Sequence, residues 1–129
     1  MMVNDMADRL HAMGVAVKAT NLFASIDPGT PNTAVVLYEY RGAIPAITMG
    51  VSSPTVLMPN LHVMVRGATL AEMDTLAKAV FSALNKFSGE INGTRYLFVR
   101  PLSSFYDVGP DEHRRPRAVC DFRVHVVTS

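Results

Sequence analysis

The sequence has little of what secreted, membrane-spanning or polyanion-binding proteins require. Its single cysteine, Cys120, excludes a disulfide within the chain. No apolar run approaches the roughly 18 residues that a bilayer-spanning helix needs. The first residues lack the basic start and long apolar core of a secretory signal peptide. The net charge of +1 gives no overall attraction to nucleic acid or anionic membranes. We therefore expect a chain that folds in a cytoplasm and has no membrane partner.

Signatures of catalysis and metal binding are also missing. The chain has four histidines: His11, His62, His113 and His125. None is spaced from another, or from the cysteine, as zinc ligands are, and we expect His62 and His125 to form a polar cross-strand pair. There is no G-x-S-x-G elbow, no Walker loop and no G-x-G-x-x-G motif. The sequence therefore predicts no enzyme, no metal and no cofactor.

Apolar residues at helical spacing predict two helices. The first covers residues 4–13, where Val3, Met6, Leu10 and Met13 share one side before Gly14. The second opens with a capping box at 69–72 and extends for roughly 17 residues. Its apolar stripe consists of Leu70, Met73, Ala77, Val80, Leu84 and Phe87. Each helix can thus pack one face on a core.

Five segments rich in β-branched and aromatic residues predict strands. They are 21–26, Thr33–Tyr40, 60–66, Tyr96–Pro101 and 118–127. Turn residues separate them at 27–32 and at Asn92-Gly93. The long apolar segment Arg41–Pro59 is expected to be a loop that docks on its own domain or, in an oligomer, covers a neighbour.

Together these elements predict an α+β (α/β) fold in a single domain, residues 1–129, with one mixed sheet of about five strands and two helices on one face. The strand–helix–strand order from 60 to 101 favours a parallel crossover and leaves an antiparallel return open. Cys120 falls on the apolar side of the last strand, as an inert core residue. The opposite sheet face is expected to carry His62, Met64, Arg66, Asp121, Arg123 and His125.

The order of several motifs resembles the tail terminator proteins of long-tailed bacteriophages, also labelled minor capsid or tail completion proteins. The matching pieces are "NLFASIDPGTPNTAVVLYEYRG", "MPNLHVMVRG", "VFSALN", "INGTRYL" and "GPDEHRRPRAVCDFRV". Each is weak alone, but their order and spacing extend from about Gly14 to Val127. The sequence departs from the family pattern in its apolar segment Arg41–Pro59 and at Met64. Both departures concern partner contacts rather than the fold.

The resemblance implies a structural protein that catalyses no reaction. Its copies would form a hexameric ring on the head-proximal end of the tail tube. The ring would stop tube polymerisation and present a surface to the head-completion (stopper) protein. DNA would pass through the lumen only as cargo, and the protein would reside in the virion after assembly in the host cytoplasm.

A closed ring needs two different complementary patches on each subunit. Candidate subunit-interface residues are His62, Arg66, Arg123 and His125 on the sheet, and Ile44, Met49, Val51 and Leu57 in or near the long loop. Candidate contacts to the tail tube or stopper are Arg41, Asp111, Glu112, Arg114 and Arg115. Ion pairs explain this last group better than an acid–base pair does.

Three alternatives stay open. The first is another neck or head-completion ring protein of the virion. The second is a small α/β enzyme or ligand-binding domain, which would need a convergent polar pocket that the sequence does not indicate. The third is a nucleic-acid-binding module acting through "RRPR" at 114–117, whose binding would depend steeply on salt.

Overall fold

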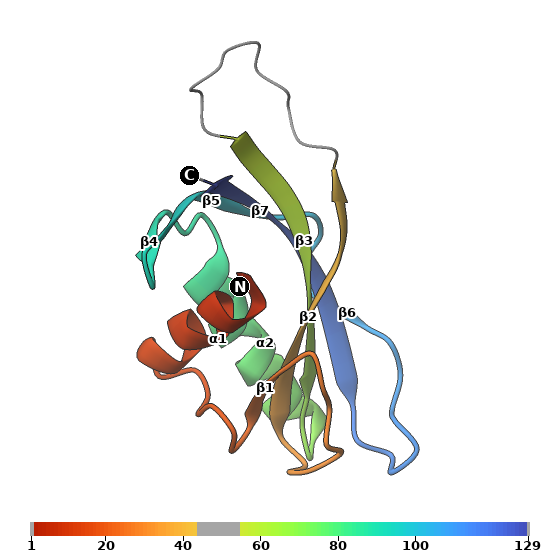
Figure 1. Cartoon of the computed structure of the whole chain (residues 1–129). Helices are drawn as coiled ribbons and strands as arrows, with labels where there is room; N and C mark the ends of the chain where they lie inside the picture. Colours follow the sequence, from red (N-terminus) through yellow and green to blue (C-terminus); the bar gives the residue numbers. More distant parts are fainter. Residues whose placement is uncertain (1, 44–54, 129) are drawn as a thin grey trace.

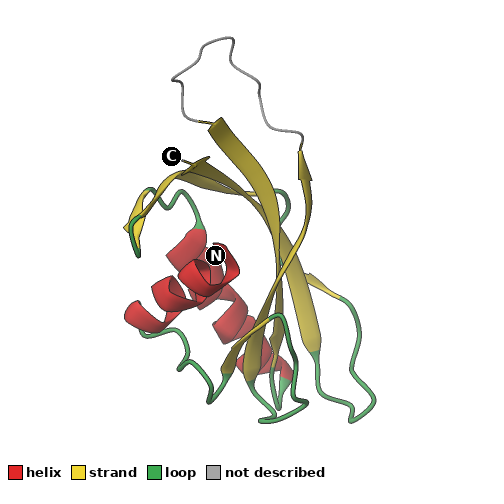
Figure 2. Cartoon of the chain, viewed as in Figure 1, coloured by secondary structure: helices red, strands yellow, loops and turns green. Residues whose placement is uncertain are grey.

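The computed structural model describes residues 2–43 and 55–128, which form two helices and a seven-stranded mixed sheet. The elements are α1 (Met2–Ala12), β1 (Leu22–Ala24), β2 (Ala34–Ala43), β3 (Thr55–Arg66), α2 (Leu70–Leu84), β4 (Gly89–Ile91), β5 (Thr94–Pro101), β6 (Tyr106–Asp107) and β7 (Arg117–Thr128). Both helices lie on one side of the sheet, which curls around them (Figures 1 and 2). The predicted α+β architecture is confirmed. The strand count exceeds five because the short strands β4 and β6 carry no sequence pattern of their own.

The strand order is β1-β2-β3-β7-β5-β4, and β6 pairs with the start of β7. Among the named strands of the described residues, β1 and β2 pair in parallel and every other pair is antiparallel. Since β3 and β5 are both antiparallel to β7, they run in the same direction. The predicted parallel crossover therefore exists, with β7 inserted between its two strands.

The main core lies between the helices and the sheet. Alternation along β3 places Leu61, Val63 and Val65 in it, and Cys120 and Phe122 of β7 join them as predicted. Burying such side chains stabilises the fold by roughly 1.5–3 kcal/mol each. Two residues of the predicted stripes are exposed instead: Met13 (52%) and Leu70 (61%). Met13 lies beyond the end of α1 and Leu70 is the first residue of α2, outside the parts that pack on the sheet.

The joint between β3 and α2 requires glycine. A Cβ at Gly67 would lie 2.5 Å from the Met73 nitrogen and 2.8 Å from the Thr69 oxygen. The capping box predicted here forms: the Thr69 hydroxyl accepts the Glu72 N–H at 3.2 Å. The Glu72 carboxylate in turn accepts the Ala68 N–H at 3.2 Å. Two backbone N–H groups at the start of α2 are thus hydrogen-bonded where the chain leaves the sheet.

A polar contact attaches α1 to the β4–β5 hairpin. Asp5, only 3% exposed, accepts hydrogen bonds from the Tyr96 hydroxyl and from Asn92 Nδ2, the latter at 3.0 Å. Burial and the Asp5 carboxylate raise the pKa of Tyr96, so its hydroxyl stays a donor. The predicted Asn92-Gly93 turn joins β4 to β5, and both residues have the positive φ of a type I′ turn.

The predicted loop Arg41–Pro59 is largely a strand hairpin at its ends. β2 continues to Ala43 and β3 begins at Thr55, with a register shift between Tyr40 and Ala43. The loop prediction is therefore wrong for these ends, because apolar and proline-containing sequence can still pair as strands where its backbone finds a partner. Residues 44–54 lie outside the described ranges. Neither of the two described helices is long and apolar enough to cross a membrane.

Candidate interaction surface

A polar hollow lies at one end of the sheet, and charged side chains line it, among them Asp27, Arg66 and Arg115. No group of three or more His, Cys, Asp or Glu side chains in residues 2–43 and 55–128 could hold a metal ion. Every buried side-chain polar atom among them also has a hydrogen-bond partner. The sheet side opposite the helices is a candidate surface for partners (Figure 2).

We call this side the open face. Residues that oppose one another in paired strands share a face, which assigns each strand residue to one side. The open face carries Ala34, Val36, Tyr38, Asn60, His62, Met64, Arg66, Arg95, Phe98, Arg100, Tyr106, Arg117, Val119, Asp121, Arg123, His125 and Val127. The predicted polar face thus exists, although its middle is apolar.

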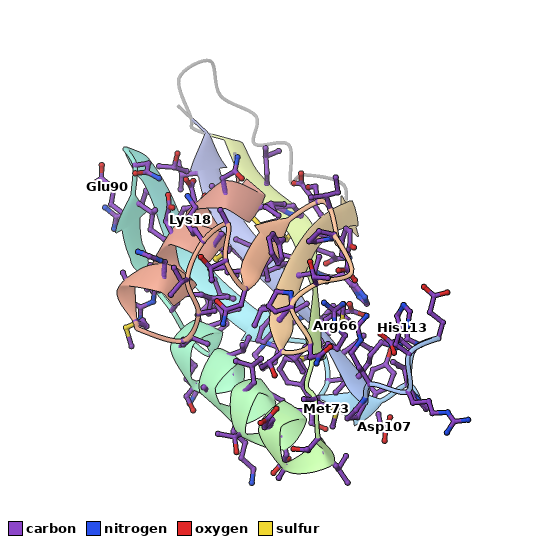
Figure 3. The ribbon with its side chains drawn as sticks, turned by 90° about the horizontal axis from the view of Figure 1, so that it is seen from below. Lys18, Arg66, Met73, Glu90, Asp107 and His113 are labelled. Carbon is purple, nitrogen blue, oxygen red and sulfur yellow. The ribbon has the colours of Figure 1, made fainter. Side chains whose placement is uncertain are left out.

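One end of the open face, which we call the clamp end, is built around Arg66. Its guanidinium donates to Asp27 Oδ2 at 2.8 Å, to the Pro31 carbonyl at 2.8 Å and to the Asn32 carbonyl at 3.3 Å. Arg66 is 1% exposed (Figure 3 shows it among the side chains of the adjoining loops). The side chain proposed from the sequence as a subunit contact is therefore occupied within its own subunit.

The loop 108–116 adds a second arginine to the clamp end. Arg115 Nε donates to Asp111 Oδ2 at 2.8 Å, and Arg115 Nη2 lies 2.8 Å from the same oxygen. Arg115 Nη1 donates to the Gly29 carbonyl at 2.6 Å. Burial raises the pKa of the Asp111 carboxyl, but hydrogen bonds from the backbone and side chain of Arg115 and from the His113 N–H outweigh it and lower the pKa to about 2. The pair ties this loop to the loop containing Gly29. Asp111 and Arg115, which the sequence suggested as contacts to the tail tube or stopper, therefore hold loops together within the subunit.

The tip of the same loop points away from the molecule. Glu112 and Arg114 are exposed, and His113 between them lies at the outer edge in Figure 3. Glu112 Oε1 is 3.8 Å from His113 Nε2, but both side chains are mostly solvent-exposed. Of the residues predicted to contact tail tube or stopper, Glu112 and Arg114 are the ones that a partner could reach.

The middle of the open face is apolar with one polar pair. Val36, Met64 and Val119 form a small buried cluster. Next to it, His62 Nδ1 lies 2.7 Å from Asp121 Oδ1. The predicted His62–His125 pair is wrong, because the register places Asp121 opposite His62.

The other end of the open face, which we call the cationic end, consists of Phe98, Arg100, Arg123 and His125. Arg100 of β5 and Arg123 of β7 oppose each other directly. Arg123 Nε donates to Asn60 Oδ1 at 3.4 Å. The rings of Phe98 and His125 contact at 6.2 Å between centroids. Burial and the charges of Arg100 and Arg123 lower the pKa of His125.

Two residues of this end, Phe98 and Arg100, were absent from the sequence prediction. A β-bulge between Tyr96 and Phe98 explains the omission. Strict alternation from the buried Tyr96 would have placed Phe98 and Arg100 on the core side. With one extra residue in β5, Val99 enters the core and its two neighbours reach the open face.

Some predicted residues cannot be assigned to a surface. Leu57 is half-buried and packs against the main core. Ile44, Met49 and Val51 lie outside the described residues, as does the side chain of Arg41. The prediction that these four contact partners therefore stays a prediction.

The fold has neighbours among solved structures, although no protein-family model and no curated protein matches the sequence. One chain of the "Virion of native gene transfer agent (GTA) particle" has a TM-score of 0.70 and 16% identity. The match covers 98% of this chain and 95% of that one. A second solved chain has a TM-score of 0.54 and 12% identity, covering 99% of this chain and 94% of its own. At these identities the likeness concerns the fold, and it extends over the whole domain.

Proposed function

We propose that this chain is a structural protein of a phage-type virion and acts as a tail terminator. Copies would form a ring on the head-proximal end of the tail tube, stop its polymerisation and present a surface to the head-completion protein. The observation that carries the proposal is the fold likeness to a gene transfer agent virion chain, which spans nearly the full length of both chains. The order of the five sequence motifs supports the finer assignment to tail terminators.

The distribution of polar groups supports a function that resides in surfaces. Within the described ranges, charged side chains that are buried serve to hold loops or helices in place, as Arg66 and Asp5 do. Exposed charges occur at the 112–114 tip and at Arg100 of the cationic end, and others lie on and after α2, among them Asp74, Lys78 and Lys86. A ring that contacts a neighbour, a tube and a head protein needs several such separate surfaces on each subunit.

The ring is tested by the mass of the purified protein in light scattering over a concentration series, followed by negative-stain imaging. We expect a hexameric ring, either in solution or on added tail tubes. A protein that stays monomeric at every concentration and is not recruited to one end of the tubes would contradict the proposal. Recruitment to isolated heads instead of tubes would favour another neck or head-completion protein.

The contact with the tube is tested at the exposed tip. Arg114→Glu should abolish recruitment to tube ends, because it reverses a charge that has no structural partner among the described residues. Lys86→Glu is the matched control, since it makes the same charge change at an exposed residue that follows α2. If both variants are recruited to tube ends equally well, the 112–114 tip does not contact the tube.

A further inference from the structure

The cationic end holds two like charges opposite each other without compensation. Arg100 and Arg123 occupy opposed positions on β5 and β7, where Cβ atoms are about 5 Å apart and like charges destabilise the sheet. In the part of the chain that the structure describes, no carboxylate lies within ion-pair distance of either guanidinium. The isolated subunit therefore retains an unfavourable arrangement that an anionic partner would relieve.

The β-bulge places these groups where they are. It turns Arg100 and Phe98 outward while keeping Val99 fully buried. Bulges recur where a sheet re-aims a side chain for a purpose. Without the extra residue, the strand could not combine its core contacts with an arginine on the open face. The bulge thus brings Arg100 to the same face as Arg123.

The charged neighbours leave the surroundings positive. Arg95 is on the same face, and Glu90 of β4 opposes it. The nearest carboxylate on β7, Asp121, is already paired with His62. His125 opposes Phe98 beside the arginine pair, and burial and the charges of the two arginines lower the pKa of His125. No other acidic side chain in the described strands opposes the arginine pair.

The apolar groups around the arginines indicate a protein partner rather than a nucleic acid. Phe98 is 37% exposed, and Leu97 in the bulge is 40% exposed. Arginine with aromatic and aliphatic side chains is the composition typical of protein interfaces. Nucleic-acid surfaces instead gather many cations on a strongly basic domain, whereas this chain has a net charge of +1.

A second copy of the chain does not offer the matching acids. Several exposed carboxylates of the described residues are already used: Glu72 caps α2, Asp74 pairs with Lys78, and Asp107 accepts the Gly109 N–H. Glu39, Glu90 and Glu112 lie on three separate elements, and segment 44–54 contains no acidic residue. Two adjacent guanidiniums suit neighbouring carboxylates on one segment.

We propose that the cationic end binds an acidic, partly apolar segment of a different protein, with Arg100 and Arg123 sharing its carboxylates and Phe98 contacting its apolar side chains. This replaces the sequence-based assignment of Arg123 and His125 to a contact between copies. It rests on the proposed function, which makes the partner another virion protein that meets the ring.

The test uses a short fluorescein-labelled peptide of repeated Glu-Glu-Leu-Leu, which in extended form presents carboxylates and leucines together on each side. Fluorescence anisotropy with the full chain should show binding that weakens with salt. Arg100→Gln and Arg123→Gln should each weaken it about tenfold. Lys86→Gln, which removes an exposed cation outside both proposed contacts, should leave it unchanged. A peptide of repeated Gln-Gln-Leu-Leu should not bind.

Each remaining outcome overturns the proposal. The absence of peptide binding does so directly, and so does an equal loss in Lys86→Gln, which would indicate unspecific charge attraction. A thymidylate oligomer that binds more tightly, and loses affinity in the same two variants, would assign the site to nucleic acid. Light scattering on the same samples separates this result from ring formation, because it reports the oligomer mass whether or not peptide binds.

Discussion

The two ends of the open face use arginine in opposite ways. At the clamp end, Arg66 is 1% exposed and donates to one carboxylate and two carbonyls. At the cationic end, Arg100 is exposed and faces Arg123 across the strands. Both ends belong to the same sheet side, and residue type and strand position alone do not distinguish them. The difference comes from loops, since two loops bring acceptors to the clamp end.

The comparison gives a physical criterion for separating structural from functional charge. A buried charge whose hydrogen bonds are satisfied within the subunit stabilises the fold only as long as its partners remain. Arg66 also opposes a like charge, Arg117, but loop carbonyls accept hydrogen bonds from both. An exposed charge that opposes a like charge without a carboxylate or carbonyl partner costs stability. The first kind should unfold the protein when removed, and the second should stabilise it.

The largest effect is expected from Arg66→Ala. Removing this side chain leaves Asp27 and two loop carbonyls without their donor, so the free energy of unfolding should fall by roughly 3 kcal/mol. Urea denaturation measures it. The control is Arg114→Ala at the exposed loop tip, which should change stability by less than about 0.5 kcal/mol. If both variants lose the same small amount, the clamp end does not hold the loops.

A smaller, pH-dependent effect is expected from Asp111→Asn. The folded pKa of Asp111, about 2, lies below its ordinary value of 3.8. Its ionised form therefore adds stability above that ordinary value, and the contribution is lost as pH falls towards 2. The variant should be less stable at neutral pH and should lose less stability than the wild type during acid titration.

Thermal melts between neutral and acidic pH check this prediction. Asp107→Asn is the control, since Asp107 is exposed and makes its hydrogen bond to Gly109 N–H at a turn. The melting temperatures of Asp111→Asn and the wild type could instead fall in parallel over the acidic range. That result would show that the Asp111–Arg115 pair does not stabilise the clamp end.

The periodic elements of this fold could be predicted from sequence, because their patterns are local. Alternation identified both faces of β3 and β7, and the capping box located the start of α2. What failed depended on distant or irregular backbone. Arg66 and Arg123 look alike in the sequence, and only the contact with Asp27, on a loop remote in the chain, separates them.

The candidate site was harder to predict than the fold for the same reason. Its outward residues follow a bulge in β5, and "RYLFVRP" carries no glycine or proline at that point to mark one. The sheet position of Arg123 and His125 was predictable from alternation. Their neighbours Phe98 and Arg100 were not, since a shift of one residue moves a side chain to the other face.

Arg100→Thr is expected to have the smallest effect, and it sharpens the comparison most. Its change in the free energy of unfolding should have the opposite sign to that of Arg66→Ala. Removing one of two opposed cations relieves repulsion and introduces a residue that favours strands, so the free energy of unfolding should rise by about 0.5 kcal/mol. Adding Arg123→Thr should raise the free energy of unfolding little further through charge, because the first substitution already removes the repulsion between the two arginines. Urea denaturation of both variants at low salt measures the difference. A loss of stability in Arg100→Thr would mean that this arginine, like Arg66, has a structural role, and that both ends of the open face serve the fold.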